Sequence, residues 1–289
     1  MKINRTLMDL MRSDWLISLE GLQAYAPIAH KIITGQSMDV EADKSALVSV
    51  FDSTGKRITA DEKGNVNLGK DSIAVVEMVG PMMKYGDWCS YGADDIVSQL
   101  EVLDANPNIS GIVLKIDGPG GAVSAIGPFI DFGANKKTPV IALVDQCCSL
   151  HYWIACAAAD YIMADNNVSA TIGSVGVMTS FADNRKYLES LGYVFHEIYA
   201  PESTHKNEAF TLALEGKYEM IQKEHLSPLA VKFQEAVRAA RPNIQDKEGV
   251  LSGKTFGADK ALAYGMIDAI GNLRSAMNRL NVMSETKTL

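Results

Sequence analysis

Long apolar runs, net positive charge and cysteine are all scarce in this sequence of 289 residues. No apolar run approaches the roughly 20 residues that a helix needs to cross a bilayer. The formal net charge of −8 at pH 7 disfavours a nucleic-acid partner on electrostatic grounds. The N-terminal stretch carries charges throughout and lacks the apolar core of a secretory signal peptide. These absences predict a soluble cytoplasmic protein with no membrane span and no nucleic-acid partner.

The sequence has only four cysteines, and their spacing is not that of metal ligands. A disulfide between Cys147 and Cys148, which are adjacent, would be strained. All four lie among apolar residues, where a free thiol behaves as a small hydrophobic side chain. We therefore expect buried free thiols in a reducing compartment, and neither a metal nor an organic cofactor. The four are Cys89, Cys147, Cys148 and Cys156.

Apolar strands alternate with helical segments from Ser72 onward. The segments SIAVVEMVG, GIVLKID and PVIALV are continuous apolar runs, which is typical of strands buried on both faces. The segments between them read as helices, so the order predicts an α/β fold, a parallel sheet covered by helices. A later strand, GYVFHEIYA at 192–200, and a long helical stretch from Glu215 to Arg241 complete the pattern.

The chain divides into three parts by composition. Residues 1–71 form an N-terminal arm, helical up to about residue 35 and then a polar linker or small hairpin. Residues 72–275 hold the α/β domain. Residues 276–289 form a C-terminal tail that is polar and frayed after Asn281. The helical periodicity of the arm rests on Leu7, Met11, Trp15 and Leu19, which recur at four-residue steps.

Ser149 lies at the joint between the strand PVIALV and a helix rich in alanine, IACAAAD. Serine is a preferred residue at the start of a helix, so a capping role is the ordinary explanation. The start of a helix also presents free N–H groups and the positive end of its dipole. A nucleophile whose product is an oxyanion suits the same place. The small side chains of the helix predict close packing against its neighbours.

A second signal is the segment DGPGG, Asp117–Gly121, which follows the strand GIVLKID. Adjacent glycines let the backbone approach a ligand and expose N–H groups, although a tight turn needs glycine as well. In an open parallel sheet, ligands bind at the carboxyl ends of the strands, and Ser149 follows another strand end. The amides of Gly121 and Leu150 are candidates for a two-donor oxyanion hole.

A serine nucleophile needs a base, and the usual base is histidine. His151 is too close in sequence to Ser149, in a helix start, to be placed across from it. A lysine serves only when it is neutral, which requires burial; Lys206 is the alternative to histidine. The segment IYAPESTHKNEAF holds or adjoins His196, His205 and Lys206. The histidines are His30, His151, His196, His205 and His225.

Five segments together resemble the signal peptide peptidase A family, Ser–Lys peptidases with a ClpP-like (crotonase-type) fold. They are DGPGGAVSA, CCSLHYWIACAAADYIMAD, TIGSVGVM, IYAPESTHKNEAF and GKTFGADKALAYGMID, and the match covers about residues 72–275. The resemblance implies that Ser149 is the nucleophile and Lys206 the general base. It also implies that Gly121 and Leu150 supply the oxyanion-hole amides, and that Ser174 orients the lysine.

Two departures from the family pattern bear on function. Most members have two small residues after the serine, where this chain has Leu150 and His151, so the adjacent pocket is expected to narrow. The typical member has an N-terminal transmembrane segment, and none is recognisable here. This chain looks more like the soluble relatives of tailed phages and prophages, which process capsid and scaffold proteins during head assembly.

The resemblance implies a polypeptide substrate and a homo-oligomeric ring in which neighbouring protomers help to build each active site. A loop containing Met82, Met83, Trp88 and Tyr91 is soft and aromatic, and either meets a partner or caps the protomer's own core. Three alternative functions stay open. They are a bacterial signal-peptide or peptide-degrading peptidase of the same family, a crotonase-fold acyl-CoA enzyme, and an inactive assembly protein.

Overall fold

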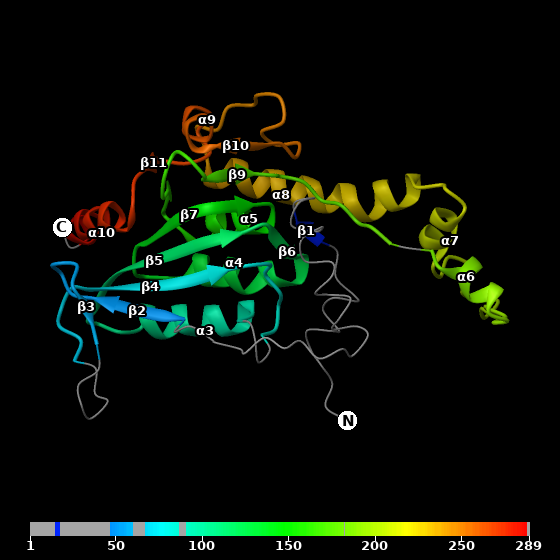
Figure 1. Cartoon of the computed structure of the whole chain (residues 1–289), viewed down its shortest axis with the longest axis horizontal. Helices are drawn as coiled ribbons and strands as arrows, with labels where there is room; N and C mark the ends of the chain where they lie inside the picture. Colours follow the sequence, from blue (N-terminus) through cyan, green and yellow to red (C-terminus); the bar gives the residue numbers. More distant parts are fainter. Residues whose placement is uncertain (1–14, 18–46, 60–66, 87–90, 182, 288–289) are drawn as a thin grey trace.

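A sheet of nine strands forms the centre of the protein (Figure 1). The computed structural model describes residues 15–17, 47–59, 67–86, 91–181 and 183–287. The strand order is β10-β9-β7-β5-β4-β2-β3, with β8 paired to β7 and β11 paired to β8. The strands of this sheet are β2 (Val48–Phe51), β3 (Arg57–Ile58), β4 (Ser72–Val79), β5 (Ile109–Gly118), β7 (Val140–Cys148), β8 (Tyr161–Ala164), β9 (Thr171–Gly173), β10 (Thr255–Gly257) and β11 (Ala269–Ile270). Outside it, β1 (Trp15–Ile17) pairs with β6 (Gly120–Ala122).

The middle of the sheet is parallel, and its edges are antiparallel. β4 pairs in parallel with β5, β5 with β7, and β7 with both β8 and β9. The hairpin of β2 and β3 adds an antiparallel edge to β4, and β10 adds one to β9. Because β4, β5 and β7 run the same way, their carboxyl ends meet at one end of the sheet (Figure 1). Ligands bind at such an end in open parallel sheets.

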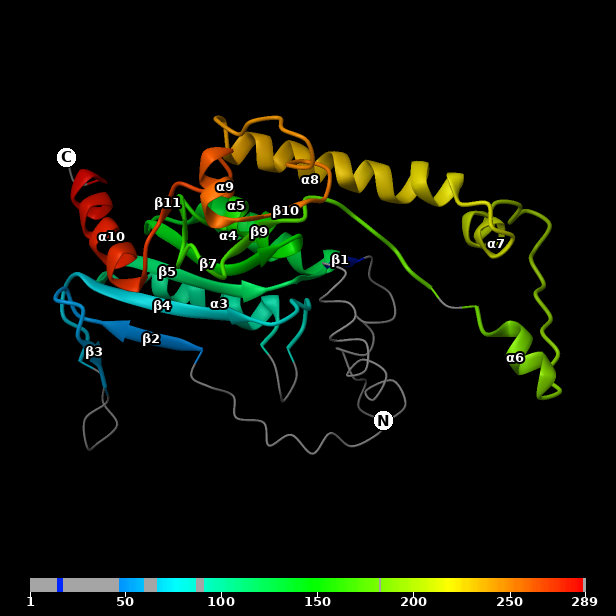
Figure 2. The ribbon, with the colours of Figure 1, turned by 45° about the horizontal axis from the view of Figure 1, so that its top comes forward.

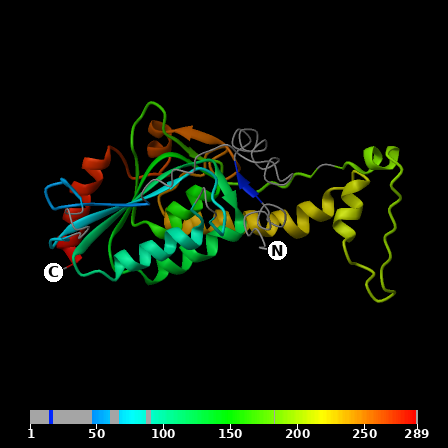
Figure 3. The ribbon, with the colours of Figure 1, turned by 60° about the horizontal axis from the view of Figure 1, so that its bottom comes forward.

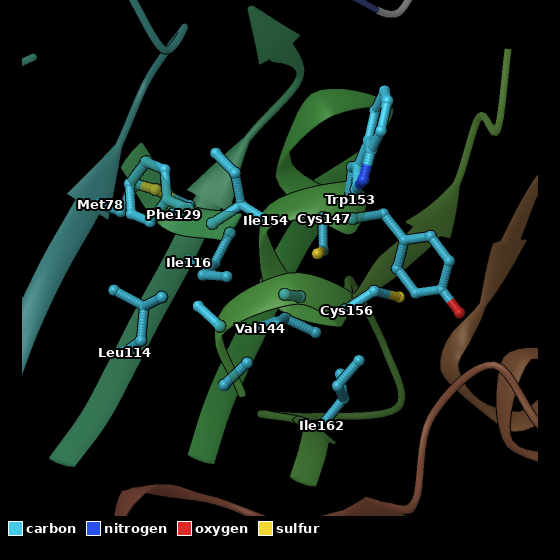
Figure 4. Packing of buried hydrophobic residues seen from close by; sticks show 14 of the residues in the cluster. Met78, Leu114, Ile116, Phe129, Val144, Cys147, Trp153, Ile154, Cys156 and Ile162 are labelled. Carbon is cyan, nitrogen blue, oxygen red and sulfur yellow. The ribbon is translucent and has the colours of Figure 1, made fainter. Parts of the chain in front are cut away.

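Helices cover both faces of the sheet (Figures 1 and 3). The larger core cluster lies between one face and helices α3, α4, α5, α8 and α9, and the smaller lies between the other face and α10. Figure 4 shows Ile116 and Val144 of the sheet packed with Ile154 of α5. The α-helices are α3 (Ala93–Asp104), α4 (Ile126–Asn135), α5 (Leu150–Ala158), α6 (Arg185–Ser190), α7 (Glu208–Leu214), α8 (Ser227–Ala240), α9 (Ala258–Ala263) and α10 (Leu273–Lys287). The structure also contains the 3₁₀ helix η1 (Val123–Ala125) and the π-helix η2 (Ile221–Leu226).

The helix after Ser149 packs as closely as its small side chains predict. A Cβ atom on Gly133 of α4 would lie 1.9 Å from the carbonyl oxygen of Ala157 in α5. Such a distance is far inside van der Waals contact, so only glycine fits there. α5 is held on its other side by Trp153, whose ring stacks on Phe233 of α8 with centroids 4.7 Å apart. The candidate nucleophile, Ser149, therefore directly precedes a helix that is closely packed on both sides.

The predicted α/β class is confirmed by this sheet and its covering helices. The three apolar runs of the sequence form β4, β5 and β7. Met82 and Met83 are buried in the protomer, with Met82 in the main core cluster, while Trp88 lies outside the described residues. The first two therefore cap the protomer's own core rather than offering a surface to a partner.

The helix predicted for residues 1–35 is wrong where the structure describes that arm. Residues Trp15–Ile17 form the strand β1, and the remaining residues of that helix lie outside the described ranges. β1 pairs antiparallel with β6. Backbone pairing with this glycine-containing strand therefore outweighs the helical preference of the local sequence.

The strand predicted at 192–200 is also wrong. These residues are exposed, and no described strand lies beside them, so they have no ladder to join. A β-strand is stabilised by its partner strand, and the local pattern of GYVFHEIYA does not supply one.

The C-terminal segment belongs to the fold instead of fraying. α10 continues to Lys287, and Ala276, Met277 and Leu280 are buried in the smaller core cluster. The helix covers the second face of the sheet, where apolar strand residues would otherwise face water. At the other end of the chain, the hairpin of β2 and β3 joins the sheet although it precedes Ser72.

Residues 183–220, named the projection below, extend away from the sheet (Figures 1 and 2). The projection contains α6 and α7, and α8 connects it to the body of the protein. Several of its apolar side chains face solvent, including Val194 at 75% exposure and Ile198 at 92%. Apolar side chains that face solvent in this number are typical of a protein interaction surface.

Candidate active site

Ser149 occupies a sharp turn between β7 and α5. Its φ is 56° and its ψ is −117°, a backbone conformation that a non-glycine residue seldom adopts. The turn is held on both sides, because the Ser149 amide donates to the Gly173 carbonyl at 2.8 Å and Tyr152 and Trp153 donate back to the Ser149 carbonyl. Backbone strain held by its surroundings is typical of a functional site. A serine on a strained strand-to-helix turn is also how hydrolases present a nucleophile.

The strand β6 lies beside this turn, at the end of β5. A Cβ atom on Gly121 would lie 2.0 Å from the Met82 carbonyl oxygen, so only glycine allows this approach. Met82 donates to the Gly120 carbonyl at 2.9 Å, and Ala122 donates to the Met82 carbonyl at 2.8 Å. Because β5 pairs with β7 up to Gly118 and Cys147, the glycine turn and Ser149 follow neighbouring strand ends.

Leu150 begins α5 and is fully buried. The amides of the first turn of a helix have no acceptor within the helix, so the Leu150 N–H is available to an oxyanion. The bulk of its side chain points into the core, where it belongs to the main cluster. The departure from a small residue at this position therefore leaves the predicted donor intact.

Ser174 lies next to the nucleophile through the strand β9. The residue before it, Gly173, accepts the Ser149 amide, and Ser174 itself has a φ of 54°. Its own amide donates to the Lys254 carbonyl at 2.8 Å. The sequence did not single out Gly176, whose carbonyl accepts the Ser149 hydroxyl at 3.5 Å. Its only sequence signal is its place in the segment TIGSVGVM.

Lys206 lies apart from these residues within one protomer. It precedes α7 in the projection, which lies far from α5 in both views (Figures 1 and 2). Its side chain is exposed and lines a cavity of about 300 Å³ together with Tyr199, Ser203 and Leu212. The structure therefore brings Ser149, Gly121, Leu150 and Ser174 to one place and leaves Lys206 outside it.

The described histidines are not placed as a base beside Ser149. His205 pairs with Glu208 at 2.7 Å and His225 lies against Phe210, both at the far end of the protein near Lys206. His196 lies in the exposed part of the projection. His151 is buried, and His30 lies outside the described residues.

Comparison with known proteins identifies the family. Residues 133–287, more than half of the chain, match the peptidase family S49. The chain belongs to peptidase family S49. This membership confirms the resemblance found in the sequence and supports the predicted enzyme class, serine peptidase.

Relatives of this S49 chain include cellular and phage proteins. "Protease 4" of Salmonella typhi is 22% identical over 294 residues, covering 95% of this chain and 46% of the relative. "Capsid assembly protease C" of Escherichia phage lambda is 31% identical over 112 residues, covering 38% of this chain and 25% of the relative. "Head-tail preconnector protein GP5" of Enterobacteria phage P21 is 28% identical over 155 residues, covering 52% of this chain and 30% of the relative. The chain thus spans about half or less of these relatives.

A solved structure of the 1510-N membrane-bound stomatin-specific protease overlaps with a TM-score of 0.47 at 15% identity, covering 71% of this chain and 82% of that one. None of the described helices of the S49 chain combines the length and apolar character that a membrane crossing needs. The described cysteines, Cys147, Cys148 and Cys156, are free and buried, and burial raises the pKa of the Cys156 thiol to about 12.

His151 is fully buried beside the glycine turn, and neither ring nitrogen makes a hydrogen bond with a described residue. A Cβ atom on Gly118 would lie 2.5 Å from its Nε2 atom. Burial lowers the pKa of His151 to about 3, although the carbonyls of Gly80 and Gly120 favour the protonated form. The ring is therefore neutral at working pH, and it fills the space beside Gly118 at the end of β5.

The buried His151 should make folding stability fall in mild acid. The pKa in the folded state lies below the unfolded value of 6.5, so the unfolded chain binds a proton that the folded chain excludes. Stability is complete above pH 6.5 and is lost as pH falls toward 3. Between pH 6.5 and 5 the free energy of unfolding should drop by about 2 kcal/mol from this group. Urea unfolding at both pH values measures the drop.

His151→Leu provides the matched control, since leucine has similar volume and no proton to bind. In this variant the contribution of about 2 kcal/mol should disappear from the difference between the two pH values. An equal pH dependence in the variant and the wild type would assign the acid sensitivity to other groups.

Proposed function

We propose that this chain is a serine endopeptidase whose nucleophile is Ser149 and whose base is Lys206 of a neighbouring copy. The observation that carries the proposal is the strained turn at Ser149, which lies beside the glycine strand β6 at neighbouring strand ends. The amides of Gly121 and Leu150 then provide the two donors of an oxyanion hole. Removing one such donor typically costs about 3 kcal/mol in the barrier.

The reaction follows from these roles. The neutral amine of Lys206 takes the proton of Ser149 Oγ as the oxygen attacks a peptide carbonyl. The tetrahedral oxyanion is held by the Gly121 and Leu150 amides and collapses to an acyl-enzyme, while the protonated Lys206 gives its proton to the leaving amine. Water then attacks the ester by the same steps and restores Ser149. Ser174, one residue from the Gly173 carbonyl that fixes Ser149, is proposed to orient the amine.

A neighbouring copy is proposed because Lys206 lies in the projection, away from its own Ser149 (Figure 2). The exposed apolar side chains of the projection, such as Val194 and Ile198, would be covered by contact with another protomer. Such contact would also exclude water from Lys206, and desolvation favours the neutral amine that catalysis requires. A head-to-tail contact of this kind closes into a homo-oligomeric ring when its rotation allows.

The proposed substrates are capsid or scaffold proteins of a phage or prophage head, cleaved within an assembling procapsid. The support is the similarity to capsid assembly protease C of phage lambda and to the phage P21 preconnector protein. The similarity to protease 4 of Salmonella typhi keeps a cellular peptide-degrading role as the alternative. Incubation of the protein with purified procapsids and with unfolded casein separates the two, because only a head protease prefers the procapsid.

A mixture of two inactive variants tests the shared site. Ser149→Ala and Lys206→Ala should each be inactive alone. After subunit exchange in equal amounts, about a quarter of the sites should pair an intact Ser149 with an intact Lys206, since each site draws on two copies at random. Casein cleavage should therefore recover to about a quarter of the wild-type rate.

The control is a mixture in which one chain carries both substitutions. Mixing that double variant with Ser149→Ala leaves no intact serine and should give no recovery. If affinity-tagged mixed oligomers form and the two single variants still show no activity, then Ser149 and Lys206 do not act across copies.

A further inference from the structure

The strand β1 lies on the open edge of β6, the strand that carries Gly121 (Figure 1). The two run antiparallel, with Trp15 opposite Ala122, Leu16 opposite Gly121 and Ile17 opposite Gly120. The pairing joins segments about a hundred positions apart in the sequence, so it is a tertiary contact. Ile17 is only 6% exposed, which shows that the segment is packed against the body.

The other edge of β6 is already occupied. Gly120 accepts from Met82 and Ala122 donates to Met82, at 2.9 and 2.8 Å. Backbone groups of successive strand residues point to opposite sides, so the N–H and C=O of Gly121 point away from Met82 and toward β1. The register places Leu16 opposite that amide. The proposed oxyanion donor therefore faces the chain's own backbone.

The nucleophile is covered in the same state. Ser149 is only 1% exposed, and its hydroxyl is directed to the Gly176 carbonyl. β6 consists of two glycines and an alanine, so its open edge recognises backbone rather than side chains. An exposed edge of this kind binds extended polypeptide by strand addition. In this structure the added strand is β1.

We infer that the open edge of β6 is where an extended polypeptide substrate adds as an antiparallel strand, and that residues 15–17 of the same chain occupy it as a built-in competitor. A substrate must displace β1 before its carbonyl reaches the Gly121 amide. The inference rests on the proposed function of Ser149 and adds a regulation of that site. Polypeptides that match the edge in length and extended backbone displace the segment, and small folded proteins do not.

Leu16→Pro tests the inference, since proline has no N–H to give to the ladder and is excluded from paired strands. The rate at which a fluorophosphonate probe labels Ser149 should rise about tenfold, the gain expected when the paired state holds roughly nine molecules in ten. Casein cleavage should show a matching fall in KM with kcat unchanged. Leu16→Ala is the matched control, because it keeps the backbone N–H and should label at the wild-type rate.

Hydrogen exchange gives a readout independent of activity. In the wild type and in Leu16→Ala the Gly121 amide should be protected, and in Leu16→Pro it should exchange faster while the amides of β4 and β5 keep their protection. The wild type labelled at Ser149 supplies a test without substitution, since the bound probe takes the Gly121 amide and exchange at residues 15–17 should rise.

The outcomes separate this inference from the proposed function. If Leu16→Pro and the wild type show equal labelling and equal exchange of the Gly121 amide, then residues 15–17 do not compete with the substrate for β6. If the Gly121 amide exchanges faster in Leu16→Pro but no variant is labelled, then Ser149 is not the nucleophile. In that case β6 is not the edge to which a substrate adds.

Discussion

Replacing Ser149 by alanine is expected to abolish peptide cleavage and fluorophosphonate labelling, with a loss of about 10⁴-fold or more in kcat. No other described serine lies at a strained strand-to-helix turn with the glycine strand beside it; Ser174 shares the positive φ but lies on the far side of Gly173. The variant should fold, because the hydroxyl makes only one long hydrogen bond, to the Gly176 carbonyl. Gel-based labelling and casein cleavage measure the loss, and circular dichroism checks the fold.

Ser174→Ala is the matched control for Ser149→Ala. It removes a hydroxyl one residue from the Gly173 contact and should lower kcat while keeping probe labelling, since the nucleophile remains. Labelling or full cleavage that persists in Ser149→Ala would remove Ser149 from the mechanism. Persistent labelling would assign the nucleophile to another residue, whereas a wild type that is not labelled would favour a crotonase-type site, in which no serine is acylated.

The sequence predicts the central strands of the sheet well because each of them has a recognisable apolar pattern. β4, β5 and β7 are continuous apolar runs bounded by turn residues, and such runs are stable only inside a sheet covered on both faces. The nearby placement of Ser149 and Gly121 follows from the same logic. Residues at the carboxyl ends of adjacent parallel strands are neighbours whatever their separation in the chain.

Elements whose structure depends on a distant partner were missed. Trp15–Ile17 fits a helical pattern, yet the free edge of β6 turns it into a strand. Residues 192–200 have the composition of a strand and find no described neighbour. α10 looks polar at its end, and only the apolar face of the sheet fixes it as a helix. The local sequence pattern indicates the secondary structure that a segment favours, but the segment or strand it packs against determines the structure it adopts.

The position of Lys206 relative to Ser149 is the feature of the candidate site that the sequence predicts least well. Motif order assigns the residue, but its distance from Ser149 depends on how α8 carries the projection away from the body (Figure 3). No local pattern encodes the contact with a second copy that we propose for Lys206. This dependence makes the lysine the most informative residue to replace.

Lys206→Arg is expected to lower cleavage by about 10³-fold at every pH, since general acid–base catalysis contributes 10²–10⁴ and guanidinium does not release its proton. Casein cleavage by the wild type and the variant, measured at several pH values, checks the loss.

Lys217→Arg is the matched control for Lys206→Arg. Lys217 lies in the same projection and pairs with Glu215 at 2.8 Å, an exposed ion pair that arginine can keep. This control should cleave at the wild-type rate, so any loss in Lys206→Arg belongs to its own amine rather than to a disturbed projection. Retained activity in Lys206→Arg, together with loss in His196→Ala or His205→Ala, would give the role of base to histidine.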